Sequence, residues 1–143
     1  MSEKSIRVLI VDDLPWVREG LATVLKLAAR SVTPRLEVVG EAQNGLEAIG
    51  QLRALQPDVI LMDLEMPGMD GYETTRRIKA EKPAPRVIIL SIHTGPEAQQ
   101  RAQAAGADGF VTKGASYEII LNAILAEEKI FNSIDPKEGE IHE

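Results

Sequence analysis

Residues 59–71 read Val-Ile-Leu-Met-Asp-Leu-Glu-Met-Pro-Gly-Met-Asp-Gly, so four apolar residues run directly into Asp63 and a turn follows. A short, continuous apolar run bounded by turn residues is typical of a strand buried on both faces of a parallel sheet. Asp63 then stands at the carboxyl end of a central strand, the edge where open α/β sheets bind their ligands. We therefore expect Asp63 to be a functional residue that needs a partner of opposite charge.

The composition is that of a single globular domain. The chain has 143 residues, 44% of them apolar, which is enough for one substantial core. It has no apolar run of membrane-spanning length and no signal-peptide pattern, so no membrane association is predicted. Without cysteine the chain forms no disulfide, and we expect a cytoplasmic location. The net charge of −6 disfavours nonspecific binding to nucleic acid, which requires clustered Lys and Arg.

Strand patterns and helix patterns alternate five times along the chain. Strands are predicted at residues 6–11, 36–42, 59–63, 87–90 and 110–112, and helices at about 14–30, 46–55, 71–80, 97–104 and 116–124. This alternation predicts an α/β fold with a doubly wound five-stranded parallel sheet, flanked by five helices and joined by right-handed crossovers. We expect one domain over residues 1–126 and a linker or acidic C-terminal tail over residues 127–143, because the chain turns polar there.

Polar residues follow four of the predicted strands, namely Asp12 and Asp13, Asp63, Ser91 and Lys113. Parallel strands bring their carboxyl ends to one edge, so we expect these side chains to converge. Three carboxylates in one small site repel each other unless a cation is present. Mg²⁺ accepts carboxylate oxygens, carbonyl oxygens and water, and Lys113 adds a second positive charge. The set suits phosphoryl transfer onto Asp63, because aspartate forms acyl phosphates.

Each of these residues also has a simpler structural interpretation. Asp12 and Asp13 fit an acidic pair at a helix N-terminus, where the helix macrodipole stabilises negative charge. Ser91 fits a turn residue, Lys113 a solvated surface charge, and Phe110 an ordinary core aromatic. The shared position of the polar residues at successive strand ends favours the functional interpretation.

Five motifs in this order closely resemble the receiver domain of two-component response regulators. They are Val11-Asp12-Asp13, Asp63 with residues 66–71, Ser91, residues 106–109 (Gly-Ala-Asp-Gly), and residues 110–113 (Phe-Val-Thr-Lys). The resemblance covers about residues 6–125, and residues 90–93 and 112–116 are most similar to receivers of the NarL/FixJ type. It implies a flavodoxin-like (βα)5 fold of the receiver type.

The resemblance implies a role for each matching residue of the acidic set. Asp63 accepts a phosphoryl group from a sensor histidine kinase. Asp12 and Asp13 hold Mg²⁺ together with Asp63 and the backbone carbonyl of Glu65. Lys113 contacts the phosphoryl oxygens. The chain would thus be a phosphoacceptor with slow self-catalysed phosphotransfer and autodephosphorylation, not a turnover enzyme.

The resemblance also implies a switch. Ser91 bonds the phosphoryl group, Phe110 turns inward, and the surface of the fourth helix, fifth strand and fifth helix changes to bind a partner. Glu65, Ile92 and His93 lie at positions that tune access to the acceptor and the lifetime of the phosphoryl group. Homodimerisation on phosphorylation is compatible with this scheme.

Several points stay open. Gly114 stands where the family often has a cis-proline, so the isomer of the Lys113–Gly114 bond is undetermined. Receivers of this type usually continue into a helix-turn-helix domain, so we expect an excised receiver whose output is transcription through a DNA-binding domain absent from this chain; a stand-alone receiver is the alternative. The cognate kinase, the stimulus and the target genes cannot be derived from the sequence.

Two rival functions remain. One is a Mg²⁺-dependent phosphohydrolase with an aspartyl nucleophile, but such enzymes place the nucleophile after the first strand with a second aspartate two residues later. Here the first strand ends in adjacent aspartates, Asp12 and Asp13. The other rival is an interaction module that is no longer phosphorylated, and the intact polar set argues against it.

Overall fold

The structure, a computed structural model, describes residues 4–133. In chain order its elements are β1 (Ile6–Val11), α1 (Pro15–Ala28), the 3-10 helix η1 (Ala29–Ser31), β2 (Leu36–Ala42), α2 (Gly45–Leu55), β3 (Val59–Asp63), α3 (Gly71–Lys79), β4 (Arg86–Ser91), α4 (Pro96–Ala104), β5 (Gly109–Thr112), α5 (Tyr117–Leu125) and β6 (Ile130–Ser133). The predicted strands and helices are all present, and their bounds differ by a few residues at most.

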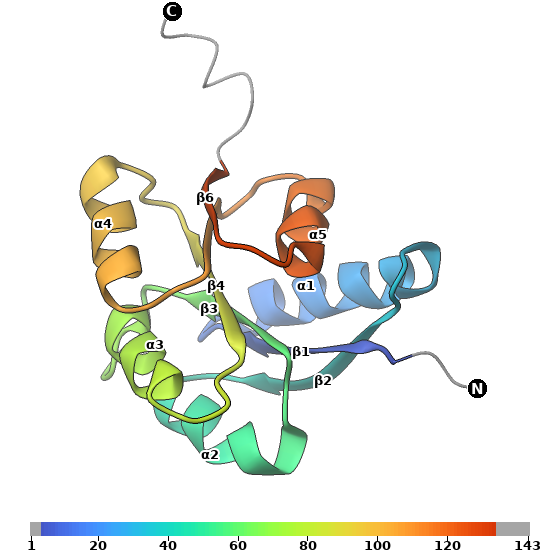
Figure 1. Cartoon of the computed structure of the whole chain (residues 1–143), viewed down its shortest axis with the longest axis horizontal. Helices are drawn as coiled ribbons and strands as arrows, with labels where there is room; N and C mark the ends of the chain where they lie inside the picture. The colour runs from blue at the N-terminus through green and yellow to red at the C-terminus, as the bar shows by residue number, and fades with distance from the viewer. Residues whose placement is uncertain (1–3, 134–143) are drawn as a thin grey trace, which may run out of the picture.

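The strands form one parallel sheet in the order β2-β1-β3-β4-β5-β6, with helices on both faces (Figure 1). Helices α1 and α5 pack on one face, and α2, α3 and α4 pack on the other. The predicted fold class, a doubly wound parallel α/β sheet, is confirmed. β2 lies on one side of β1 and β3 on the other, so the chain reverses its winding direction between β1 and β3, beside Asp63.

Strand β3 shows why the sequence folds in this way. All five of its residues are buried. Val59 and Leu61 join the apolar layer beneath α1 and α5, whereas Ile60 and Met62 join the layer beneath α2, α3 and α4. An uninterrupted apolar run is therefore needed here, because successive side chains enter two different cores.

The sheet has one strand more than the five predicted. Residues 130–133, within the segment predicted as a linker or tail, form β6 and pair in parallel with β5. Only Ile130 and Phe131 are apolar in this strand, and charged residues precede it, so no periodic pattern indicated it. The remainder of the predicted tail, residues 134–143, lies outside the described residues.

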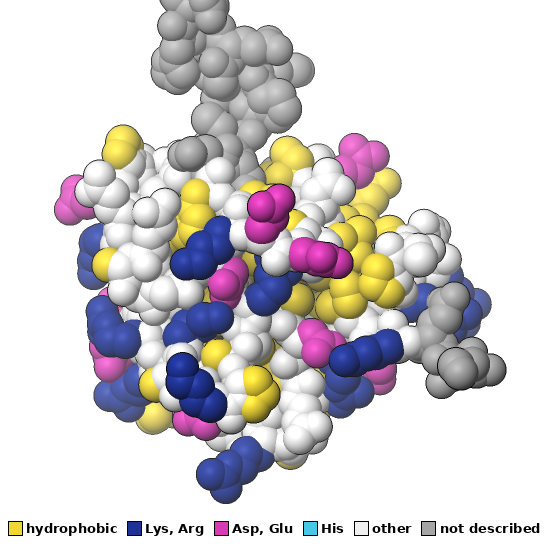
Figure 2. All heavy atoms as spheres, viewed as in Figure 1, with side chains coloured by type: hydrophobic (Ala, Val, Ile, Leu, Met, Phe, Trp, Pro, Cys, Tyr) yellow, Lys and Arg dark blue, Asp and Glu magenta, His cyan; other side chains and the backbone are white. Residues whose placement is uncertain are grey.

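Charge is distributed unevenly over the surface. Figure 2 shows Lys and Arg side chains over α2 and α3, and the last turn of α3 carries Arg76, Arg77 and Lys79. Arg76 and Arg77 pair with Glu73 on the same helix. Among residues 4–133, no helix combines the length and the apolar character that a membrane crossing requires.

Candidate functional site

Three carboxylates meet at the carboxyl edge of the sheet, as their positions at strand ends predicted. Asp12 and Asp13 follow β1, and Asp63 is the last residue of β3. One carboxylate oxygen from each residue lies within 4.8 Å of the other two. Asp12 and Asp63 are only 3% and 2% exposed. The site is therefore a concentrated, largely buried negative charge.

Lys113 supplies the positive charge. Its ammonium nitrogen lies 3.0 Å from Oδ2 of Asp12 and 3.1 Å from Oδ1 of Asp63. The loop that carries it is tied to β4, because the backbone N–H of Lys113 donates to the carbonyl oxygen of Ser91 over 2.7 Å. One ammonium group thus bridges acids delivered by two adjacent strands.

Backbone and side-chain donors hold the acids in place. The N–H of Leu14 donates to Oδ1 of Asp12 over 3.0 Å, and the N–H of Glu65 donates to Oδ1 of Asp63 over 3.3 Å. Arg18, which the sequence analysis did not single out, donates to the backbone oxygen of Asp12 over 2.7 Å. Its position one turn into α1, just after the acidic pair, is the signal that indicates it.

A glycine shapes the turn behind Asp63. A Cβ atom on Gly71 would lie 2.5 Å from the backbone oxygen of Asp63 and 2.8 Å from the Cα of Leu64. Both contacts are with backbone, which cannot move aside as a flexible side chain can. The start of α3 therefore approaches the end of β3 closely only because residue 71 is glycine.

The surroundings change the acidity of the site. Burial raises the pKa of Asp63 from 3.8 to about 6, and the negative charge of Asp12 adds to the rise, while Lys113 opposes it. Burial alone lowers the pKa of Lys113, but hydrogen bonds and charge attraction from Asp12 and Asp63 outweigh it, so the pKa of Lys113 is raised. Lys113 is therefore charged at neutral pH, yet it compensates the acids only in part.

The donor set fits a hard divalent cation. Three carboxylates face a single lysine, so negative charge is left over, and all the side-chain donors are oxygens. Mg²⁺ binds such oxygen sets and retains several waters. Asp12, Asp13 and Asp63 would hold it.

Ser91 is at the predicted edge but its hydroxyl is engaged elsewhere. The residue is 1% exposed. Its hydroxyl donates to the backbone oxygen of His93 over 3.0 Å and accepts from the N–H of His93 over 2.9 Å. The β4–α4 loop thus holds the hydroxyl through one donated and one accepted bond, and the single hydroxyl donor is in use.

The side chains of Glu65 and His93 contact each other at the surface, on the loops beside Asp63. Nε2 of His93 lies 2.7 Å from Oε2 of Glu65, and the contact joins the β3–α3 loop to the β4–α4 loop. Ile92, between Ser91 and His93, is 60% exposed. All three residues proposed as tuning positions therefore lie on the loops next to the acidic site.

Two further residues bear on the predicted switch. Phe110 is 1% exposed and belongs to the apolar layer beneath α2, α3 and α4, so it already occupies an inward position. The peptide bond between Lys113 and Gly114, left open by the sequence, is trans. Gly114 has a φ of +93°, a left-handed conformation that favours glycine and explains this residue after the lysine.

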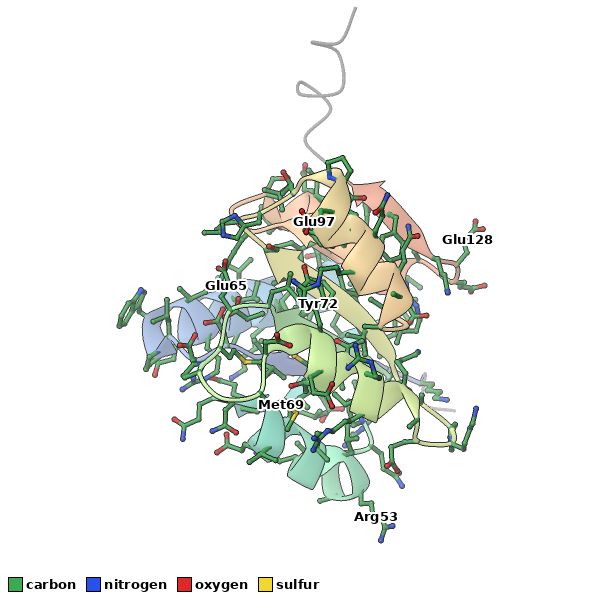
Figure 3. All side chains as sticks on the ribbon, turned by 90° about the vertical axis from the view of Figure 1, so that its left-hand side faces the viewer. Arg53, Glu65, Met69, Tyr72, Glu97 and Glu128 are labelled. Atoms are coloured by element: carbon green, nitrogen blue, oxygen red, sulfur yellow. The ribbon has the colours of Figure 1, made fainter. Side chains whose placement is uncertain are left out.

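A groove of about 380 Å³ adjoins the site between α3 and α4. Tyr72 lies between these two helices, with Glu65 and Glu97 beside it (Figure 3). The Tyr72 hydroxyl donates to the backbone oxygen of Ala98 over 3.4 Å, and the Arg101 guanidinium lies 4.1 Å from the centre of the ring. These contacts fix α4 against α3, and the sequence analysis did not anticipate them.

The doubly wound sheet carries three aspartates and a lysine together at its carboxyl edge, as the sequence motifs predicted. Residues 8–125 match the response regulator receiver domain family. The chain belongs to this family, and the resemblance inferred from the motifs is confirmed.

Among curated proteins, the chain is 42% identical over 130 residues to a protein-glutamate methylesterase/protein-glutamine glutaminase of Symbiobacterium thermophilum, covering 90% of this chain and 34% of that protein. It is 34% identical over 123 residues to the nitrate/nitrite response regulator protein NarL of Escherichia coli, covering 86% and 55%. The chain thus spans about a third to about half of the length of these relatives. The esterase activity named for the first relative is therefore not assigned to this chain.

Solved structures agree with this assignment. The signal receiver domain of NarL from Mycobacterium tuberculosis aligns with a TM-score of 0.77 and 35% identity, over 86% of this chain and 95% of that one. The response regulator domain of CheB from Thermotoga maritima aligns with a TM-score of 0.67 and 35% identity, over 84% and 89%. The chain is therefore similar in both sequence and fold to the receiver domains of these two proteins.

Proposed function

We propose that the chain is a phosphorylation-controlled switch that accepts a phosphoryl group on Asp63 from a sensor histidine kinase, with Mg²⁺. The observation that carries this proposal is the buried Asp63 carboxylate, which shares one small site with Asp12, Asp13 and Lys113. Membership in the receiver family supports the kinase as donor.

The chemistry follows from the contacts of Asp63. Lys113 and the N–H of Glu65 both contact Oδ1, so the other oxygen is the one presented to the phosphorus. In the transfer, the P–N bond of the phosphohistidine breaks as the bond from the Asp63 oxygen to phosphorus forms, and the histidine nitrogen takes up the electron pair. The bound Mg²⁺ would supply charge that stabilises the phosphoryl oxygens. Lys113 adds a second, fixed positive charge beside them.

Transmission to the output surface begins at Ser91. When a phosphoryl group is present on Asp63, the Ser91 hydroxyl leaves His93 and bonds a phosphoryl oxygen. Ser91 pairs with Thr112 of β5, and its carbonyl accepts from the N–H of Lys113. A movement of Ser91 therefore reaches β5 and changes the surface formed by α4, β5 and α5, with Phe110 kept inside.

The chain acts as an acceptor that is reset by slow hydrolysis, and not as an enzyme with turnover. Glu65, Ile92 and His93 set the lifetime of the phosphoryl group through the loops beside the site. The output is transcription through a DNA-binding domain outside this chain, an idea supported by similarity to NarL of Escherichia coli and to a DNA-binding response regulator of the LuxR family from Staphylococcus aureus. Homodimerisation of the receiver on phosphorylation is compatible with this proposal.

The test is incubation with acetyl phosphate and Mg²⁺, followed by intact-mass measurement. We expect wild-type protein to gain one phosphoryl group, and Asp63→Asn and Mg²⁺-depleted protein to gain none. The matched control is Glu127→Gln, an exposed acid far along the chain, which should react as wild type does. Equal labelling of wild type and Asp63→Asn would disprove the acceptor assignment, and sustained hydrolysis of simple phosphomonoesters would favour a phosphatase.

A further inference from the structure

The edge of β5 is covered by the chain's own β6. Figure 1 shows this strand between α4 and α5, on the surface that the proposed switch would change. Gly109 pairs with Ile130 and Val111 pairs with Ser133, and the N–H of Ile130 donates to the backbone oxygen of Asp108 over 2.8 Å. β6 therefore fills a strand-pairing edge that would otherwise be open.

The aromatic side chain of β6 points to the α4 side of the sheet. Phe131 follows Ile130, the residue that pairs with Gly109, and it lies on the same side of the sheet as Phe110. Phe131 is partly buried and packs against the apolar layer that contains Phe110. A main-chain edge and an adjoining aromatic site thus bind the same four-residue segment.

Residue 109 shows that this edge is shaped for a close strand. A Cβ atom there would lie 3.2 Å from the backbone oxygen of Ile130 and 2.7 Å from Cδ1 of Ile88. Glycine removes that obstruction, so a strand backbone can approach β5 directly beside the core.

The attachment is limited, however. The three-residue step from Ile130 to Ser133 lies opposite the two-residue step from Gly109 to Val111, so the pairing is irregular. The connecting residues 127–129 are exposed. The link is held by Arg86, which donates to the backbone oxygen of Ile124 over 3.1 Å and reaches the oxygen of Glu128 over 3.5 Å. β6 can therefore leave while α5 remains capped by Arg86.

We propose that the edge of β5 between α4 and α5 is a docking groove for an extended strand, and that residues 130–133 are its resident occupant. The partner is a protein segment that pairs in parallel with β5 and inserts an aromatic side chain where Phe131 lies. An uncharged segment with a β-branched residue before the aromatic matches what the groove now holds.

Phosphorylation of Asp63 favours the exchange, a part of the inference that rests on the proposed function. Ser91 and Thr112 are paired, as are Ile89 and Phe110, so a shift of β4 at Ser91 moves the strand to which β6 is attached. While β6 occupies the groove, a partner segment cannot bind. The apparent affinity for the partner is therefore reduced in proportion to the fraction of molecules whose groove is free. Loosening β6 raises that fraction.

The experiment uses a fluorescent peptide with the sequence of residues 128–133, Glu-Lys-Ile-Phe-Asn-Ser, titrated onto the full chain by anisotropy. The variant Phe131→Asp removes the anchor of the resident strand, and Glu127→Gln is the matched control in the same segment. We expect Phe131→Asp to bind the peptide about tenfold more tightly than wild type or the control. Hydrogen exchange at residues 109–112 should rise in Phe131→Asp and fall again when peptide is added.

Equal peptide binding by Phe131→Asp and wild type, or binding by neither, would refute the proposal that the edge of β5 is a docking groove. If Phe131→Asp does not fold, Phe131→Ala takes its place with the same expectations. The phosphorylation step is tested by adding beryllofluoride and Mg²⁺ to wild type, which should tighten peptide binding several-fold but not in Asp63→Asn. Labelling of Asp63 by acetyl phosphate without any change in peptide binding would refute the coupling and leave the proposed function intact. If Asp63 is not labelled but Phe131→Asp binds the peptide tightly, the proposed function is refuted and the docking groove stands.

Discussion

The ammonium nitrogen of Lys113 lies 3.1 Å from Oδ1 of Asp63, although 50 residues separate them along the chain. Lys113 also lies 3.0 Å from Asp12, so a single cation holds two buried acids together. Removing one member of such a set leaves buried charge without a partner, which costs more than the interaction contributed.

Lys113→Met therefore destabilises the metal-free protein. We expect the free energy of unfolding to fall by about 2 kcal/mol in a chelator, because Asp12 and Asp63 lose their counter-charge. Mg²⁺ replaces part of that charge, so the loss should shrink when the metal is added. Urea denaturation with and without Mg²⁺ measures both values. Lys129→Met, at an exposed position, is the control and should change neither.

The raised pKa of Asp63 makes stability depend on pH. Below about pH 3.8 the residue is protonated in both the folded and the unfolded chain, and it contributes nothing to their difference. As the pH rises towards 6, the unfolded chain ionises more readily than the folded one, so stability falls by about 3 kcal/mol in the absence of metal.

Asp63→Asn removes this penalty because the amide does not ionise. We expect the variant to be more stable than wild type by about 1–3 kcal/mol at pH 7.5 in a chelator, and equal to it below pH 4. Urea titrations across this pH range provide the measurement. A difference between the two proteins that is constant with pH would contradict the assigned cause.

The convergence of the acids was predictable because hydrophobic runs locate strand ends and parallel topology brings those ends to one edge. These two features of the sequence were enough to predict that Asp12, Asp63 and Lys113 lie together. The hydroxyl orientation of Ser91 was not predictable, since a buried hydroxyl takes whichever backbone partners its loop presents. Arg18 was missed for a related reason, because its contact is with the backbone oxygen of Asp12 and not with a side chain.

β6 shows where sequence periodicity fails. A strand with two apolar residues, Ile130 and Phe131, forms because the edge of β5 and the adjoining core accept them, and not because of its own pattern. Phe110 is similar, since its burial is consistent with both a core residue and a switch residue. In such cases the tertiary environment determines the structure, and the local sequence pattern alone does not predict it.

The close approach at Gly71 predicts a large effect from a single methyl group. Gly71→Ala places a Cβ atom against the backbone of Asp63 and Leu64, so β3 or α3 has to shift. We expect a loss of about 2–4 kcal/mol in the free energy of unfolding and weaker stabilisation by Mg²⁺. Gly50→Ala in α2 is the matched control, because nothing lies within 4 Å of its Cβ position. It should stabilise by about 0.5–1 kcal/mol.

The contact between Glu65 and His93 predicts a kinetic effect without a large stability effect. The pair is close to the surface, so His93→Ala should change the free energy of unfolding by less than about 1 kcal/mol. It also restrains the loop whose backbone holds the Ser91 hydroxyl. Freeing that loop lowers the cost of moving Ser91 towards Asp63, so phosphoryl uptake from acetyl phosphate should accelerate by up to about fivefold. Time-resolved intact-mass measurement gives the rate. Glu65→Ala removes the same contact from the other side and should accelerate uptake equally. Ile92→Ala leaves the contact in place, so acceleration by Ile92→Ala alone would point to steric access and not to the Glu65–His93 contact.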